Sequence, residues 1–316
     1  IPMWIADMDF STPPFIIEAL RERLNHEILG YSFRPDSYFD AFISWVYSLH
    51  HWEVKRDWIV FSPGVVPALN LCTLAYTTKG DEIIIQPPVY PPFHAAVRDH
   101  ERKIVYNHLL ETDKGWIMDF EGLCELITPA TKMIILSNPH NPVGRVWKRE
   151  ELSRLVDICY EKEIVILSDE IHSDIMMYGN RHVPVASLSE KAAKITVTCM
   201  APSKTFNLAG LTTSSMIIPE KILREKFWNT LHGIHIHLGN IFGNVASEAA
   251  YTYGHEWLNQ MIGYVGRNID LVVRFCNQHL PLIKPVIPEA TYMVWLDCRK
   301  MNMSGKYGKN RFFFIS

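Results

Sequence analysis

A lysine and an aspartate each follow a predicted strand, and together they could form a reactive pair. Lys204 lies in APSKTFNLAG (residues 201–210), where few charged residues surround it in the sequence. Desolvation in such surroundings lowers the pKa of an amine and makes the amine a nucleophile. Asp169 follows the apolar run IVIL, and a carboxylate that emerges from a buried strand normally needs a cationic partner. A surface lysine and an Asp169–arginine salt bridge are the structural alternatives.

Two loops could present ligand-binding groups at the same edge of the sheet, because open α/β sheets bind ligands at the carboxyl ends of their strands. In SPGVVPALN (62–70) a glycine turn leads into a helix, and the amides of Val65 and Val66 could bind a phosphate there. In SNPHNPVGR (137–145) Asn141 could donate to an anionic oxygen. Either loop could instead be only a strand-to-helix connection. A lysine for a Schiff base and an aspartate for a ring nitrogen are what pyridoxal phosphate requires.

The elements that must position these residues are strands of a parallel sheet. Several β-branched runs between Asp57 and Met216 are separated by segments with helical periodicity. Runs such as MIIL and IVIL are apolar at successive residues, which is typical of strands covered on both faces. The predicted strands are WIVFS, DEIIIQ, KIVYN, KMIILS, IVILSD and KITVTC.

The pattern changes after Pro219, which indicates a second domain. Long helical segments, KILREKFWNTLHGIH and residues 241–280, precede the strand-like ATYMVWLDC. We therefore predict an α/β fold with a large cofactor-binding domain at 26–230. A smaller α+β domain is expected from 1–25 and 231–316, incomplete at both ends.

Composition favours a small-molecule enzyme. Lys plus Arg number 31 against 34 Asp plus Glu, a net charge of −3, so no bulk basic field points to nucleic acid or to an anionic membrane. Six scattered cysteines without a C-x-x-C pair are typical of reduced thiols. No apolar run approaches the roughly 18 residues of a membrane span, and no signal peptide is visible. We expect a cytoplasmic protein without a membrane or nucleic-acid partner.

The chain resembles the fold type I pyridoxal-phosphate enzymes of the class I/II aminotransferase superfamily. Within them it is similar to the MalY/PatB-type cystathionine β-lyases, or cysteine C–S lyases. The resemblance covers nearly the whole chain and implies a mostly parallel sheet of the seven-stranded type. The matching segments are PMWIADMDF, GYS, SPGVVPAL, PPVYPPF, NPHNPVGR, SDEIHSD, SKTFNLAG and YMVWLDCR.

The resemblance implies roles for individual residues around pyridoxal 5′-phosphate. Lys204 forms the Schiff base and then acts as general base, and Asp169 pairs with the ring nitrogen. Asn141 binds the phenolic oxygen, and Tyr90 stacks on the ring. The remaining cofactor-binding residues are expected to be Val65, Val66, Ser203, His172 and Tyr31.

The substrate side and the oligomeric state are also implied. Trp4, Ala6 and Asp7 are expected near the substrate, and Tyr31 is expected to reach the active site of the partner subunit in a homodimer. The chain departs from many relatives at Thr212, where they carry a phosphate-binding arginine, and at His172, where they carry tyrosine.

The predicted activity is C–S β-elimination from cystathionine or cysteine-type substrates, which yields a thiol or hydrogen sulfide, pyruvate and ammonia. An aminotransferase of the same fold is the close alternative, and a regulatory protein that retains the fold is the alternative from another class. The preferred sulfur substrate stays open, because the pocket is expected to combine residues from the N-terminal segment, the partner subunit and a C-terminal region. The arginine that binds the substrate carboxylate is expected beyond the C-terminal RFFFIS. A histidine cluster, His232, His235 and His237, lacks a remote carboxylate or cysteine, so we expect no metal site.

Overall fold

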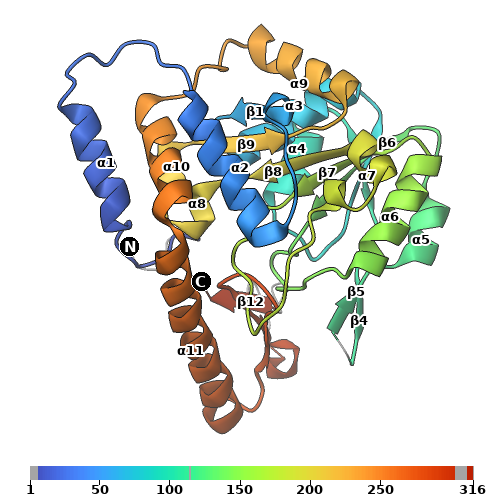
Figure 1. The fold of residues 1–316 in the computed structure, drawn as a ribbon. Coiled ribbons are helices and arrows are strands. Elements are labelled where there is room, and N and C mark those ends of the chain that lie inside the picture. The colour runs from blue at the N-terminus through green and yellow to red at the C-terminus, as the bar shows by residue number, and fades with distance from the viewer. Residues whose placement is uncertain (1–5, 114, 303–311, 316) are drawn as a thin grey trace.

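A seven-stranded sheet forms the centre of the computed structural model, which describes residues 6–113, 115–302 and 312–315 (Figure 1). The neighbours β3, β2, β6, β7 and β8 are parallel, whereas β9 runs antiparallel to both β8 and β1. In spatial order the strands are β1 (Ile59–Ser62), β9 (Ser214–Ile217), β8 (Thr196–Met200), β7 (Val165–Asp169), β6 (Thr131–Ser137), β2 (Glu82–Ile85) and β3 (Lys103–Tyr106).

Helices cover both faces of this sheet, which explains why its central strands are almost continuously buried. Leu69, Phe93 and Phe227 belong to a core on one face, whereas Leu123 and Leu155 belong to a core on the other. The helices of this part are α3 (Val65–Tyr76), α4 (Pro92–Arg98), α5 (Phe120–Leu126), α6 (Arg149–Glu161), α7 (Glu190–Ile195), α8 (Pro202–Thr205) and α9 (Lys221–Gly233).

The remaining elements lie beside the sheet and below it in Figure 1. Helix α10 packs against both α1 and α2, and the long α11 extends away from the sheet (Figure 1). The strands β10, β11 and β12 form an antiparallel sheet, and β4 pairs with β5 in a hairpin. The bounds are α1 (Pro14–Leu24), α2 (Asp36–His50), α10 (Ile241–Tyr253), α11 (His255–His279), β4 (Leu110–Thr112), β5 (Gly115–Ile117), β10 (Lys284–Val286), β11 (Val294–Asp297) and β12 (Phe312–Ile315).

The α/β prediction with a mostly parallel seven-stranded sheet is confirmed, and all six predicted strands between Asp57 and Met216 form. Other details differ from the prediction. The strands β4, β5 and β9 were not predicted, and the helical segment 241–280 is divided at Gly254. Phe206 packs against that glycine so closely that a Cβ atom there would lie 2.3 Å from Phe206 Cζ. The domain boundaries stay a prediction. In the described part of the chain, no helix combines the length and apolar character needed to cross a membrane.

Candidate active site

A cavity of about 280 Å³ lies at the carboxyl ends of β6, β7 and β8, where the sequence places its polar motifs. Parallel pairing puts Ser137, the last residue of β6, opposite Asp169, the last residue of β7. Asp169 in turn lies opposite Cys199 of β8, and α8 begins shortly after that strand. The predicted site residues that line the cavity are Ala6, Val65, Val66, Tyr90, Asn141, Asp169, His172, Ser203 and Lys204.

Lys204 lies in α8, and its amine is held at the cavity wall. Its Nζ atom donates a hydrogen bond to the Ala6 carbonyl oxygen at 3.3 Å. Desolvation lowers the pKa of this amine, and the charges of Asp7 and Asp169 only partly oppose the shift. A lowered pKa increases the fraction of neutral amine, which is the form that can attack a carbonyl carbon or accept a proton.

Asp169 ends β7 as a buried carboxylate that faces the cavity. Its Oδ1 atom accepts a hydrogen bond from the Ile171 amide at 3.2 Å. Burial raises its pKa to about 7, and the charge of Glu170 adds to this shift, while the Ile171 hydrogen bond and Lys204 oppose it. No arginine in the described ranges pairs with Asp169, so the salt-bridge alternative is not realised there. A cationic ring nitrogen would therefore meet an acceptor that has no competing cation except Lys204.

The turn between β1 and α3 presents backbone amides to the same cavity. Gly64 precedes α3 with a φ of 118°, a conformation that L-residues rarely adopt, so glycine allows the chain to enter the helix at this angle. The amides of Val65 and Val66 belong to the first helical turn, where backbone N–H groups have no partner within the helix. Together with the Ser203 side chain, they form a donor set suited to a phosphate group.

Three further side chains face the cavity. The backbone amide of Asn141 donates to Ser137 Oγ at 3.0 Å, while its side-chain amide makes no hydrogen bond to any residue that the structure describes. Burial raises the pKa of Tyr90, so its phenol is neutral at physiological pH. Burial lowers the pKa of His172 to about 3, and the positive charge of Lys204 adds to the effect, so this imidazole is neutral. Its Nδ1 atom is buried and has no hydrogen-bond partner among the described residues.

Two of the predicted residues that the structure describes, Tyr31 and Asp7, do not line the cavity. Tyr31 is 97% exposed and lines a neighbouring hollow, which shares Thr212 with the cavity. Asp7 is exposed and influences Lys204 through its charge. Trp4 lies outside the described residues.

Tyr292 is a site-adjacent residue that sequence reasoning missed. Its hydroxyl donates to the Ala6 carbonyl oxygen at 2.7 Å, the same oxygen that accepts from Lys204. Its ring also meets His172 edge to face, with 5.7 Å between the ring centroids. Tyr292 stands in the motif YMVWLDCR, but the pairing joins residues 286 positions apart, so no local pattern indicates it.

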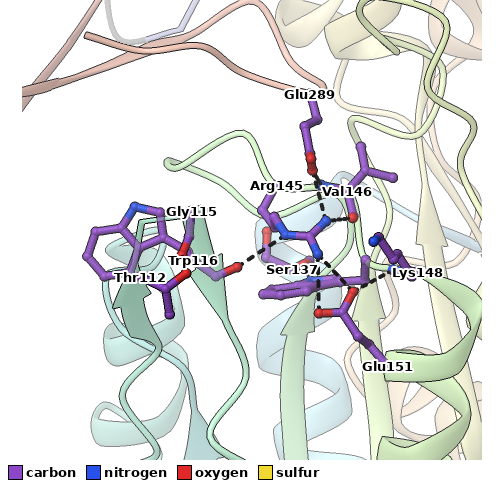
Figure 2. Close-up of polar contacts among 10 residues, drawn as sticks. Thr112, Gly115, Trp116, Ser137, Arg145, Val146, Lys148, Glu151 and Glu289 are labelled. Atoms are coloured by element: carbon purple, nitrogen blue, oxygen red, sulfur yellow. Dashed lines mark hydrogen bonds and ion pairs between the residues drawn. The ribbon is translucent and has the colours of Figure 1, made fainter. Parts of the chain in front are cut away.

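Arg145 anchors the loop that carries Asn141 (Figure 2). Its guanidinium group forms ion pairs with Glu289 and Glu151, each at 2.9 Å, and donates to the Trp116 carbonyl oxygen at 3.1 Å. The Arg145 side chain is only 13% exposed. These contacts join the loop to α6, to the β4–β5 hairpin and to the segment before β11.

The histidine cluster does not form a recognisable metal centre. The rings of His232 and His237 stack at 3.7 Å between centroids. Within residues 6–113 and 115–302, no group of three or more His, Cys, Asp or Glu side chains could hold a metal ion.

The order of the strands and the cavity that Lys204 and Asp169 line agree with the pyridoxal-phosphate enzymes that the sequence resembles. Residues 2–307 match the family aminotransferase class I and II, and the chain belongs to this family.

Individual proteins of known name or structure are similar to the chain over most of its length. Cystathionine beta-lyase PatB of Bacillus subtilis (strain 168) is 46% identical to the chain, over 96% of this chain and 79% of that protein. A PLP-bound putative aminotransferase from Clostridium difficile 630 has a TM-score of 0.93 at 43% identity, covering 96% of this chain and 78% of that one. The PLP-bound C-S lyase from Staphylococcus hominis has a TM-score of 0.89 at 36% identity, covering 97% and 79%.

Proposed function

We propose that this chain is a pyridoxal-phosphate-dependent C–S β-lyase that cleaves cystathionine or cysteine-type substrates. The observation that carries the proposal is that Lys204, Asp169 and Asn141, which are far apart in the sequence, line one cavity. The identity to PatB and the likeness to the S. hominis C-S lyase support the reaction and its sulfur-containing substrate class. The overall change is cystathionine plus water to homocysteine, pyruvate and ammonia.

The residues of the cavity fit pyridoxal phosphate. When bound, the cofactor acts as an electron sink for the bonds broken at the substrate Cα atom. Each group of the cofactor would have a protein partner of matching chemistry, and none of these partners needs a metal ion. The partners are Lys204 for the aldehyde, Asp169 for the ring nitrogen, Asn141 for the phenolic oxygen, Tyr90 for the ring face, and Val65, Val66 and Ser203 for the phosphate.

Lys204 and Asp169 act on different protons of the reaction. The neutral amine of Lys204 accepts the Cα proton, and the Ala6 carbonyl orients that amine through its hydrogen bond. Asp169 keeps a proton on the ring nitrogen, because a buried carboxylate is strongly stabilised by a cationic partner. The neutral His172 adds no positive charge that would compete for Asp169.

Product analysis with cystathionine tests the proposal. The lyase forms pyruvate and a thiol without any keto-acid acceptor. Strict dependence on an acceptor would instead establish the aminotransferase alternative, which the C. difficile relative's description also favours.

A second measurement separates the enzyme from a binding protein that only retains the fold. Cofactor-free protein mixed with pyridoxal phosphate should develop the visible absorption of the Lys204-bound cofactor. The Lys204→Ala variant should lose both this absorption and thiol release. If the wild-type protein showed neither the absorption nor thiol release, the result would favour the alternative of a binding protein.

We further propose a homodimer in which Tyr31 serves the partner's active site. Exposed apolar side chains surround Tyr31 on its loop, among them Ile28, Leu29 and Phe33, and the adjacent hollow holds about 850 Å³. A contiguous exposed apolar patch of this kind is typical of an interaction surface.

Mixed dimers test this arrangement. Lys204→Ala and Tyr31→Ala subunits should each be impaired alone. After mixing, each heterodimer should regain one intact site if Tyr31 acts on the partner, and none if it acts within its own subunit. Sedimentation analysis should report a dimer. We also place the protein in the cytoplasm, since all six cysteines are free thiols and five of them are buried.

A further inference from the structure

A buried carboxylate behind the cavity contacts the short helix that carries Lys204. Asp174 lies in the turn after β7, and its Oδ2 atom accepts hydrogen bonds from Thr205 Oγ1 at 2.8 Å and from Trp45 Nε1 at 3.1 Å. Its Oδ1 atom lies 3.2 Å from His50 Nε2. Asp174 is not among the described residues that line the cavity, so its effect on the reaction must pass through one of these partners.

The contact with Thr205 bears directly on the position of Lys204. Thr205 is the next residue and ends α8, a helix of only four residues. A single turn is costly to form and gains few internal hydrogen bonds, so outside contacts must hold it in place. The fully buried Thr205 provides one such contact. Asn207 provides another, because its Nδ2 atom donates to the carbonyl oxygens of Met8 (2.8 Å) and Phe10 (3.0 Å).

Asp174 is suited to hold this helix because it is charged and both of its carboxylate oxygens have hydrogen-bond partners. Burial alone would raise its pKa, but the hydrogen bonds from His50, Thr205 and Trp45 and the charge of His50 outweigh burial and lower the pKa. Hydrogen bonds to an ionised acceptor are stronger than those between neutral groups. His50 and Trp45 both belong to α2, so Asp174 fastens α8 to a long helix of the scaffold.

We propose that Asp174 is a positioning residue that fixes the Lys204 amine through Thr205. The inference rests on the proposed function and deepens it. The first step that it serves is attachment of the cofactor: Lys204 Nζ forms a C=N bond with the aldehyde carbon, and the aldehyde oxygen leaves as water with two protons. A displacement of about 1 Å in a reacting group can cost roughly a hundredfold in rate.

Substitutions at Thr205 test the inference with little change in volume. Thr205→Val removes the hydroxyl donor, and Thr205→Ser retains it. The matched control is Thr198→Val in β8, since Thr198 is equally buried and its hydroxyl makes no hydrogen bond to the described residues. The measurements are kcat, KM for cystathionine, and the rate at which visible absorption develops when cofactor-free protein meets pyridoxal phosphate.

We expect Thr205→Val to lower kcat and to slow cofactor attachment roughly tenfold to a hundredfold, with KM nearly unchanged. Thr205→Ser should restore both rates, and Thr198→Val should match the wild type. Asp174→Ala should show at least this loss, and adding Thr205→Val to it should slow neither rate further, because Asp174→Ala already removes the hydrogen bond between Thr205 and Asp174. If Asp174→Ala does not fold, the comparison of Thr205→Val with Thr205→Ser tests the inference by itself.

Two results would overturn the inference: wild-type rates in Thr205→Val, or equal losses in Thr205→Val and Thr198→Val. Cofactor attachment needs no substrate. A wild-type protein that forms no pyruvate would therefore refute the proposed function while the attachment rates still test the role of Asp174.

Discussion

Replacing Gly144 with alanine probes how the Asn141 loop is held. Gly144 has a φ of 70°, and its carbonyl oxygen accepts hydrogen bonds from the amides of Glu289 (2.8 Å) and Ala290 (3.1 Å). A Cβ atom at this position would lie 2.5 Å from Pro288 Cβ and 2.9 Å from Pro288 Cα. The substitution therefore forces apart two segments that two backbone hydrogen bonds hold together.

The expected loss in the free energy of unfolding of Gly144→Ala has two parts. A left-handed conformation costs an L-residue about 1–2 kcal/mol. Overpacking against a fixed neighbour costs about 1–3 kcal/mol more, which brings the total for Gly144→Ala to about 2–5 kcal/mol. Gly179 isolates the first part, because its φ is 78° and a Cβ atom there would meet nothing within 4 Å. Gly179→Ala should therefore cost only about 1–2 kcal/mol.

Urea unfolding of the two variants measures the difference. The gap of about 1–3 kcal/mol corresponds to a roughly 5- to 160-fold change in the ratio of folded to unfolded protein. Gly144→Ala should also release pyruvate more slowly than Gly179→Ala, because only the former displaces Asn141. Equal free energies of unfolding would refute the reasoning, since they would show that the segment around Pro288 moves aside without cost.

Two other predictions concern charge. Asp169 binds its proton more tightly in the folded state, with a pKa of about 7, than in the unfolded state, near the ordinary 3.8. Its contribution to stability is therefore fully present below about pH 4 and is lost as the pH rises through about 7. Urea unfolding of cofactor-free protein at pH 5 and pH 8 should show this loss in the wild type and a smaller one in Asp169→Asn; equal losses would contradict it. Arg145→Ala should lower the free energy of unfolding by about 2–3 kcal/mol, because it leaves the Glu151 and Glu289 carboxylates without their ion-pair partner. Arg98→Ala removes an exposed pair with Asp99 and should cost at most about 0.5 kcal/mol, so similar losses in the two arginine variants would contradict the role given to Arg145.

Local sequence pattern was sufficient to predict six of the seven strands of the central sheet. The buried strands β6 and β7 contain runs of successive apolar residues, as expected for strands that helices cover on both faces. Parallel strands direct their carboxyl ends to one edge, so motifs that follow β6, β7 and β8 had to lie close together. Asp169, Asn141 and Lys204 could be placed near one another on that basis alone.

Other features depend on contacts between distant segments. Strand β9 is only four residues long and gains its partners from β1 and β8. The long helical segment divides at Gly254, the residue against which Phe206 packs. Neither event changes the hydrophobic periodicity of its own segment, so neither could be foreseen from that pattern.

The sequence by itself determined the fold class and predicted Lys204, Asp169 and the donors around them as site residues, because those features follow from residue type and from position along a strand. The tertiary structure decided what holds the pair in place. Lys204 and Tyr292 both donate to the Ala6 carbonyl, and Asp174 accepts from Thr205. These hydrogen bonds join residues 31 to 286 positions apart, and only the packing of the whole chain brings such groups within hydrogen-bonding distance.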